Sequence, residues 1–157
     1  MDTGENRANR IPWPPIILIS ALIDGFLLNW LAPWARPVGW ISLWFLLGAA
    51  LIAGGVGLVV WAARTFQRDQ TTISPIGRAS ALTTSGPFRF SRNPIYLADV
   101  MIIAGFGFAF GILWFFPLAI LAGILIRYLA ISGEERHLEA RFGEDWLAYK
   151  GRVRRWI

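Results

Sequence analysis

The sequence contains no cysteine, a single histidine, and few charged residues, which make up 16% of its 157 residues. The absence of cysteine excludes disulfides, thiolate metal sites and cysteine nucleophiles. A single histidine, His137, excludes a histidine-rich metal site, and we predict no bound metal. Because 55% of the residues are hydrophobic, the composition excludes a disordered chain and is untypical of a water-soluble globule. The length is that of one domain.

Long apolar runs are abundant, and a membrane-spanning helix needs about 20 mostly apolar residues. Four segments come close to this requirement, at residues 14–32, 38–63, 94–110 and 112–131. The last two are nearly contiguous, and Gly105, Gly107 and Gly111 lie where a tight helical hairpin would turn. We therefore predict an all-α integral membrane protein, a single membrane domain over 1–157 with about four transmembrane helices.

The distribution of basic residues predicts the orientation. With four spans, 14 of the 15 lysines and arginines lie on the side that holds both termini and the loop at 64–93, and only Arg36 lies opposite. The positive-inside rule then places both termini in the cytoplasm, and we expect a bacterial inner membrane. The net charge of +5 fits contact with anionic lipid head groups better than nucleic acid. The long loop is either a functional binding loop or a lipid-facing linker.

The tail, residues 132–157, reads as an amphipathic helix or two short helices. Its apolar residues recur every three or four positions, at Leu138, Phe142, Trp146, Tyr149, Val153 and Trp156. The opposite face is charged, with Arg136, Glu139, Arg141, Glu144, Lys150 and Arg154. Such a tail can lie in the membrane interface or fold back over the bundle. Ser132 and Glu135 fit a capping box that would start this helix, unless the fourth span simply continues into it.

The second span carries small residues at a spacing of four, namely Ala49, Ala53 and Gly57, with Ala50 and Gly54 beside them. Small residues on one face allow two helices to approach closely in a membrane. This face can pack inside the monomer or across a homodimer, and we favour the monomer core because four short helices must first pack on each other.

Three ionisable residues lie in or at the edge of the spans, and charge inside a membrane is costly, so each is a candidate site residue. Asp24 is expected to form hydrogen bonds in the bundle interior. Asp99 shares a helix face with Arg92 and Tyr96, so it either binds a ligand or makes a structural contact. Arg127 either points towards the acidic residues that follow the fourth span or extends to the interface.

Two motifs in the second half of the chain resemble those of a known enzyme group. The first reads Arg-Asn-Pro-Ile-Tyr over 92–96, and the second is the pair Glu134 and Glu135, followed by Phe142-Gly143, Tyr149 and a basic end over 152–156. Together they resemble the isoprenylcysteine carboxyl methyltransferase and phospholipid methyltransferase group of integral membrane enzymes. Asn93 departs from that group, which usually has a histidine there, and Trp146 stands where a tyrosine is frequent.

The resemblance implies S-adenosylmethionine as the cofactor, held between the last spans and the tail. It implies catalytic roles for Arg92, Asn93 and Glu135. It implies cofactor-binding roles for Arg92, Pro94, Tyr96, Gly105, Gly107, Glu134, Glu135, His137 and Tyr149. The glycine pair can alternatively serve helix packing or the hairpin turn. Arg89, Asp99 and Arg127 are the candidates for binding the acceptor.

The function predicted on this basis is methyl transfer from S-adenosylmethionine to a lipid-like acceptor dissolved in the membrane, either a carboxylate or an amine. One alternative is a reductase similar to membrane sterol reductases, for which the chain is short. Another is a non-enzymatic membrane scaffold or small transporter, which would leave the paired motifs unexplained. The choice of cofactor separates these three functions.

Overall fold

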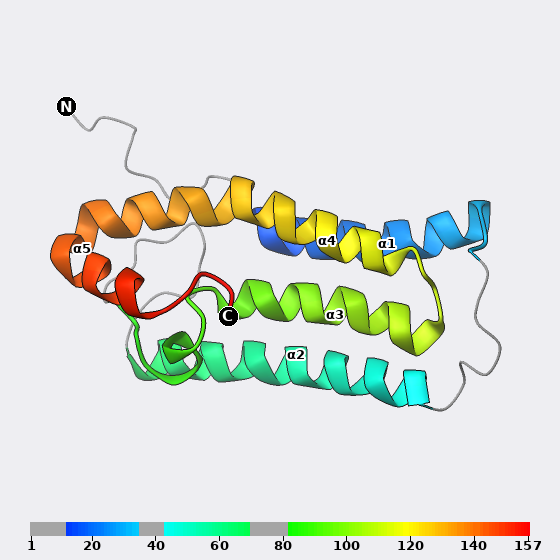
Figure 1. Cartoon of the computed structure of the whole chain (residues 1–157), viewed down its shortest axis with the longest axis horizontal. Coiled ribbons are helices and arrows are strands. Elements are labelled where there is room, and N and C mark those ends of the chain that lie inside the picture. The colour runs from blue at the N-terminus through cyan, green and yellow to red at the C-terminus, as the bar shows by residue number, and fades with distance from the viewer. Residues whose placement is uncertain (1–11, 35–42, 70–81) are drawn as a thin grey trace.

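The computed structural model describes residues 12–34, 43–69 and 82–157, and within these ranges the chain is helical without any strand. The helices, in chain order, are α1 (Trp13–Leu31), α2 (Leu43–Arg68), the short 3₁₀ helix η1 (Gly86–Arg89), α3 (Pro94–Phe110), α4 (Phe115–Ile126), the π-helical turn η2 (Arg127–Ile131) and α5 (Ser132–Arg152). Figure 1 shows α1, α2, α3 and α4 lying roughly side by side as a bundle. The all-α prediction is confirmed.

Three helical runs are long and apolar enough to cross a membrane, namely α1, α2 and the continuous run from Phe115 to Arg152. The third predicted span, α3, is apolar but has only 17 residues. Large apolar side chains such as Ile19, Leu46 and Ile120 are more than half exposed, which is typical of a surface that contacts lipid. The protein is therefore an integral membrane protein, and the count of four spans stays a prediction.

α2 and α3 pack most closely, because glycines on each helix leave room for the backbone of the other. A Cβ atom added at Gly48 would overlap backbone atoms of Gly105 and Ala109. A Cβ atom added at Gly55 would overlap the side chain of Ile102. The predicted packing face was wrong: Ala50, Ala53, Gly54 and Gly57 are exposed, while Gly48, Gly55 and Ala62 form the buried face. Gly48, Gly55 and Ala62 are seven residues apart, whereas the predicted face has a spacing of four.

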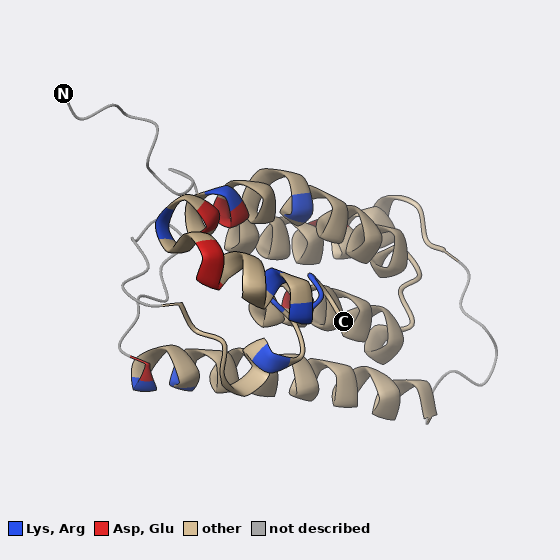
Figure 2. Ribbon diagram, turned by 60° about the vertical axis from the view of Figure 1, so that its left-hand side comes forward, with Lys and Arg blue, Asp and Glu red and all other residues tan. Residues whose placement is uncertain are grey.

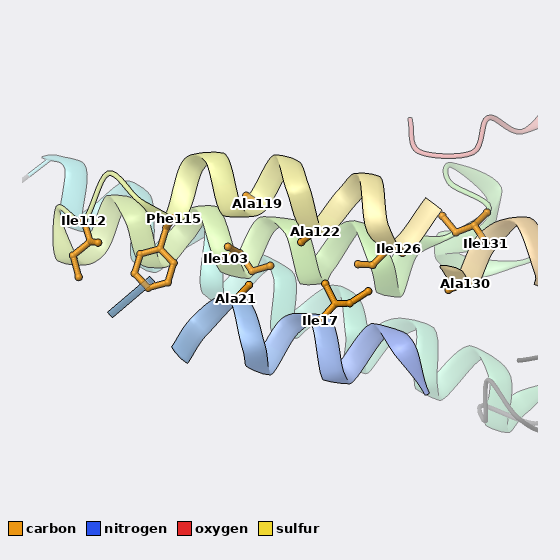
Figure 3. Close-up of a cluster of buried hydrophobic side chains, with 10 residues drawn as sticks. All are labelled: Ile17, Ala21, Ile103, Ile112, Phe115, Ala119, Ala122, Ile126, Ala130 and Ile131. Carbon is orange, nitrogen blue, oxygen red and sulfur yellow. The ribbon is translucent and has the colours of Figure 1, made fainter. Parts of the chain in front are cut away.

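The apolar core lies between α1, α3 and α4 (Figure 3). Ile17 and Ala21 of α1, Ile103 of α3, and Phe115 and Ala122 of α4 are all at least nine-tenths buried there. The predicted hairpin between the third and fourth spans turns at Gly111, whose φ of +63° favours glycine. This core packs α1, α3 and α4 against one another.

The fourth span continues without a break into the tail. Ser132 does not cap a new helix; its hydroxyl donates to the Arg127 carbonyl across the π-helical turn, and backbone before it is already helical. The helix then reverses at Gly143, where φ is +49° and ψ is −119°. Figure 1 shows the second half of α5 turning back, so that the C-terminus lies near the start of α3.

The two faces of the tail have different environments in the structure. Its apolar positions are buried or half-buried, namely Leu138, Phe142, Trp146, Tyr149, Val153 and Trp156. Its polar positions are exposed, namely Arg136, Glu139, Arg141, Glu144, Lys150 and Arg154. The apolar stripe therefore folds back over the end of the bundle.

Two further expectations need correction. α2 runs on to Arg68, so the first residues of the predicted loop are helical, because the apolar pattern ends before the helix does. Asp24 is exposed on α1, and the expected place in the bundle interior is wrong. The start of the second span at 38–42, loop residues 70–81 and the basic residues Arg7, Arg10 and Arg36 lie outside the described residues.

Candidate functional site

Charged residues of the described chain gather at one end of the bundle, where α3 begins and α5 turns back. Figure 2 shows most of them over α5, the C-terminal segment and the end of α2. We call this region the charged end; it comprises residues 91–96, the pair Glu134 and Glu135, and residues 153–157. The two sequence motifs meet there, because the reversal at Gly143 returns the chain to residues 91–93.

Glu135 lies at the centre of the charged end, between two arginines. Arg155 Nε donates to Glu135 Oε1 at 3.0 Å and its Nη2 donates to Oε2 at 2.5 Å, which is a bidentate pair. Arg92 Nη1 lies 3.4 Å from Glu135 Oε1, and both of these side chains are about 90% buried. The hydrogen bond to Glu135 raises the pKa of Arg155, so this guanidinium stays charged beside the carboxylate.

Arg92 keeps hydrogen-bonding capacity that nothing in the described chain uses. Its Nε and Nη1 are buried without a hydrogen-bond partner, and so is Nε1 of Trp146, whose indole ring lies 5.6 Å from the Arg92 guanidinium carbon. His137 Nε2, on the same helix as Glu135, is also buried and unpartnered. Unsatisfied buried donors are costly, so the N–H groups of Arg92 and Trp146 suit an anionic ligand group such as a carboxylate.

Glu134 points to a different partner. The Tyr96 hydroxyl donates to Glu134 Oε1 at 2.5 Å and so joins α3 to α5. Burial raises the pKa of Glu134, the nearby Glu135 raises it further, and the Tyr96 hydrogen bond opposes these effects. Asp99 lies one turn deeper in α3 and is only 6% exposed; within the described ranges it makes no hydrogen bond or ion pair.

Asn93 and Ser91 hold the C-terminal segment, residues 153–157, against the start of α3. Asn93 Nδ2 donates to the Arg155 carbonyl at 3.0 Å, and the Ser91 hydroxyl donates to the same oxygen at 3.4 Å. The Arg92 backbone N–H donates to the Arg154 carbonyl at 3.0 Å. The predicted catalytic residue Asn93 thus binds backbone in this structure.

Arg155 is the member of the site that sequence reasoning missed. The basic end over 152–156 was part of the motif, but nothing in the spacing singles out Arg155 among its neighbours. Arg154 beside it is exposed. The one signal in the sequence was general: the amphipathic tail carries several basic residues that could form ion pairs with its two adjacent glutamates.

Tyr149, Arg89 and Arg127 were also predicted, and none of them forms a hydrogen bond or ion pair with Glu135 among the described residues. Tyr149 donates its hydroxyl to the Phe88 carbonyl at 2.7 Å, and burial raises the pKa of that hydroxyl, which keeps it a donor. Arg89 is exposed on η1. Arg127 is exposed and lies 5.7 Å from the Tyr128 ring; it makes no ion pair with the glutamates among the described residues.

The predicted glycine pair lies deeper in the bundle. Gly105 and Gly107 follow Tyr96 by nine and eleven residues, which is roughly 14–17 Å along a helix. Gly105 contacts α2, and Gly107 contacts the start of α4. Pro94 is the buried first residue of α3 and fixes the helix start beside Asn93. These three residues shape the bundle that supports the charged end.

Comparison with known proteins gives one match. The phospholipid methyltransferase family model matches residues 43–145, about two-thirds of the chain. The match contains the first motif and the second motif as far as Gly143, and it ends before Trp146, Tyr149 and Arg155. No curated protein and no solved structure matches the chain. The match favours a methyltransferase over a reductase or a scaffold. The chain belongs to the phospholipid methyltransferase family and is a membrane methyltransferase for lipid-like substrates.

Proposed function

We propose that the protein transfers a methyl group from S-adenosylmethionine to an amine on a lipid-like acceptor. The observation that carries this proposal is the charged end itself. There, buried N–H donors without partners lie beside Glu135. Two further carboxylates, which we call the acidic face, lie nearby: Glu134 of α5 contacts Tyr96 of α3, and Asp99 lies one turn further along α3. The site therefore has one part suited to an anionic group and one part suited to a cationic group.

The donors around Arg92 and Trp146 fit the methionine carboxylate of S-adenosylmethionine. Glu135 fits the cofactor's amino group or ribose hydroxyls, and His137 Nε2 offers a partner for the adenosine part. When bound, this cofactor supplies a methyl carbon attached to a sulfonium, which an acceptor lone pair displaces in line. The chain's own contribution is to align the two reactants and to exclude water from them.

The acidic face, Glu134 with Asp99, favours an amine acceptor over a carboxylate acceptor. An anionic acceptor would meet Asp99 and Glu134, whereas an ammonium group would be stabilised by them. An ammonium group must lose a proton before its nitrogen can accept a methyl group. Glu134 is suited to take that proton, because burial raises its pKa and so makes it a stronger base.

The acceptor is proposed to enter from the bilayer, where a lipid-like molecule is already dissolved. The charged end would then face the cytoplasm, together with both termini, in a bacterial inner membrane. The exposed stripe of Ala50, Ala53, Gly54 and Gly57 on α2 is where a homodimer would pack if the protein forms one.

The first test is binding of S-adenosylhomocysteine, the demethylated product, to the detergent-purified protein by calorimetry. Wild type should bind it saturably, and Glu135→Gln should bind it at least tenfold more weakly, because the carboxylate charge is lost while side-chain size is kept. Glu139→Gln is the matched control, since Glu139 pairs with Lys150 on the exposed surface of the same helix. Binding of NADPH instead, or of neither compound, would contradict the proposal.

The second test addresses the acceptor. Vesicles carrying an ethanolamine phospholipid or a prenylated cysteine are incubated with the protein and with S-adenosylmethionine labelled in its methyl group. Label should enter the amine lipid, and Asp99→Asn should reduce this transfer while product binding stays at the wild-type level. Transfer to the carboxylate lipid alone would overturn the assignment of the acidic face.

A further inference from the structure

The C-terminal segment, residues 153–157, carries one of the two cations that contact Glu135. Arg155 occupies both oxygens of that carboxylate, whereas Arg92 reaches only one of them, at 3.4 Å and without a hydrogen bond. The segment is held in place by side chains and backbone of residues 91–93. This position lies beyond the part of the chain that the family model matches.

The charges of this cluster determine what Arg92 can bind. Glu135 carries one negative charge, and Arg92 with Arg155 carry two positive charges, so the three side chains together keep one positive charge. Without Arg155, Glu135 would be free to form a bidentate ion pair with Arg92. That pair would occupy the Arg92 N–H donors that now have no hydrogen-bond partner. A second cation on Glu135 therefore preserves the binding capacity of Arg92.

We infer that Arg155 is a positioning residue of the cofactor site, which takes up Glu135 so that Arg92 can bind the carboxylate of the ligand. This inference rests on the proposed function. It also gives a role to Asn93, where the family usually has histidine: the Asn93 amide holds the Arg155 backbone carbonyl and so keeps the guanidinium beside Glu135. The C-terminal segment therefore contributes to ligand binding through Arg155.

The test compares two nucleosides that differ at the end that Arg92 binds. S-adenosylhomocysteine has the amino-acid part, and 5′-methylthioadenosine lacks it. Affinities are measured by calorimetry for wild type, Arg155→Gln, Arg155→Lys and Arg154→Gln. The last variant is the matched control, because it removes the same charge from the neighbouring exposed residue, which makes no ion pair among the described residues.

Arg155→Gln should weaken binding of S-adenosylhomocysteine by roughly tenfold or more, because one nearby positive charge is lost in a site of low dielectric constant. Binding of 5′-methylthioadenosine should not change. Arg155→Lys should recover most of the loss, and Arg154→Gln should resemble wild type. Equal loss for both nucleosides would show a merely structural role, and tighter binding of S-adenosylhomocysteine would show that Arg155 competes with the ligand. Either result overturns the inference.

A measurement without ligand separates this inference from the proposed function. Hydrogen exchange of the Arg92 backbone amide reports whether the C-terminal segment is docked, because that amide donates to the Arg154 carbonyl. Exchange should be faster in Asn93→Ala and in Arg155→Gln than in wild type and Arg154→Gln. Unchanged exchange in both variants would overturn the inference even if wild type binds S-adenosylhomocysteine. Wild type that binds neither nucleoside would instead contradict the proposed function, and the positioning role would fall with it.

Discussion

Replacing Tyr149 by phenylalanine separates two roles for this residue, a structural one and contact with the cofactor. The Tyr149 side chain is only 3% exposed, and its hydroxyl donates to the Phe88 carbonyl at 2.7 Å. That bond joins α5 to η1 across 61 residues of sequence. Tyr149→Phe removes the donor and leaves a buried carbonyl without it, which costs about 1–3 kcal/mol of unfolding free energy. For a chain of this length, such a loss lowers the melting temperature by several degrees.

The assay is thermal unfolding in detergent, together with calorimetric binding of S-adenosylhomocysteine. We expect a lower melting temperature for Tyr149→Phe and an affinity within about threefold of wild type, because the hydroxyl is occupied by protein backbone. Tyr128→Phe is the control, since the Tyr128 ring is 68% exposed. An unchanged melting temperature with a lost affinity would refute this reasoning and would support the cofactor contact implied by the family resemblance.

Three further predictions concern other parts of the structure, and two of them have a control variant. Gly48→Ala should destabilise the protein by about 1–3 kcal/mol in thermal unfolding, whereas Gly57→Ala, where the added carbon meets no atom within 4 Å, should be neutral. Gly143→Ala should lower the unfolding free energy by about 1–3 kcal/mol, because φ is +49° there, and Gly151→Ala should not. Burial raises the pKa of Glu134, so its stabilising contribution is complete below the usual glutamate pKa and is lost as pH rises. Glu134→Gln should therefore lose less stability than wild type when pH rises from about 5 to 8; equal losses would contradict the direction of that shift.

Most of the helical elements could be predicted from hydropathy, because an apolar run of sufficient length specifies a helix in a membrane regardless of its neighbours. The first span differs by one residue at each end, and the third matches at both ends. The packing face of α2 could not be predicted in this way. All of its faces are apolar, and only the position of α3 decides that Gly48 and Gly55 are buried while Gly57 is exposed.

The candidate site was predicted in part. Arg92, Tyr96, Glu134 and Glu135 come from two motifs that the structure brings together at one end of the bundle. Arg155 was not predicted, because its place depends on the chain reversal at Gly143. A helix that ran straight through this glycine would place Arg155 about 30 Å along the helix axis from Glu135, since these residues are 20 positions apart and each residue rises by about 1.5 Å. A glycine in a helical pattern does not by itself specify a reversal.

The two glutamates also show why adjacent residues of the same type acquire different environments. Successive residues of an α-helix point about 100° apart, so Glu134 and Glu135 cannot share one partner. Glu135 turns towards the returning C-terminal segment, where two arginines compensate its charge. Glu134 turns towards α3, where its nearest partner is the neutral hydroxyl of Tyr96 and burial favours the protonated form. The two adjacent glutamates thus differ in charge environment: Glu135 is compensated, and we propose that it holds the ligand, whereas Glu134 has a raised pKa, and we propose that it accepts the proton.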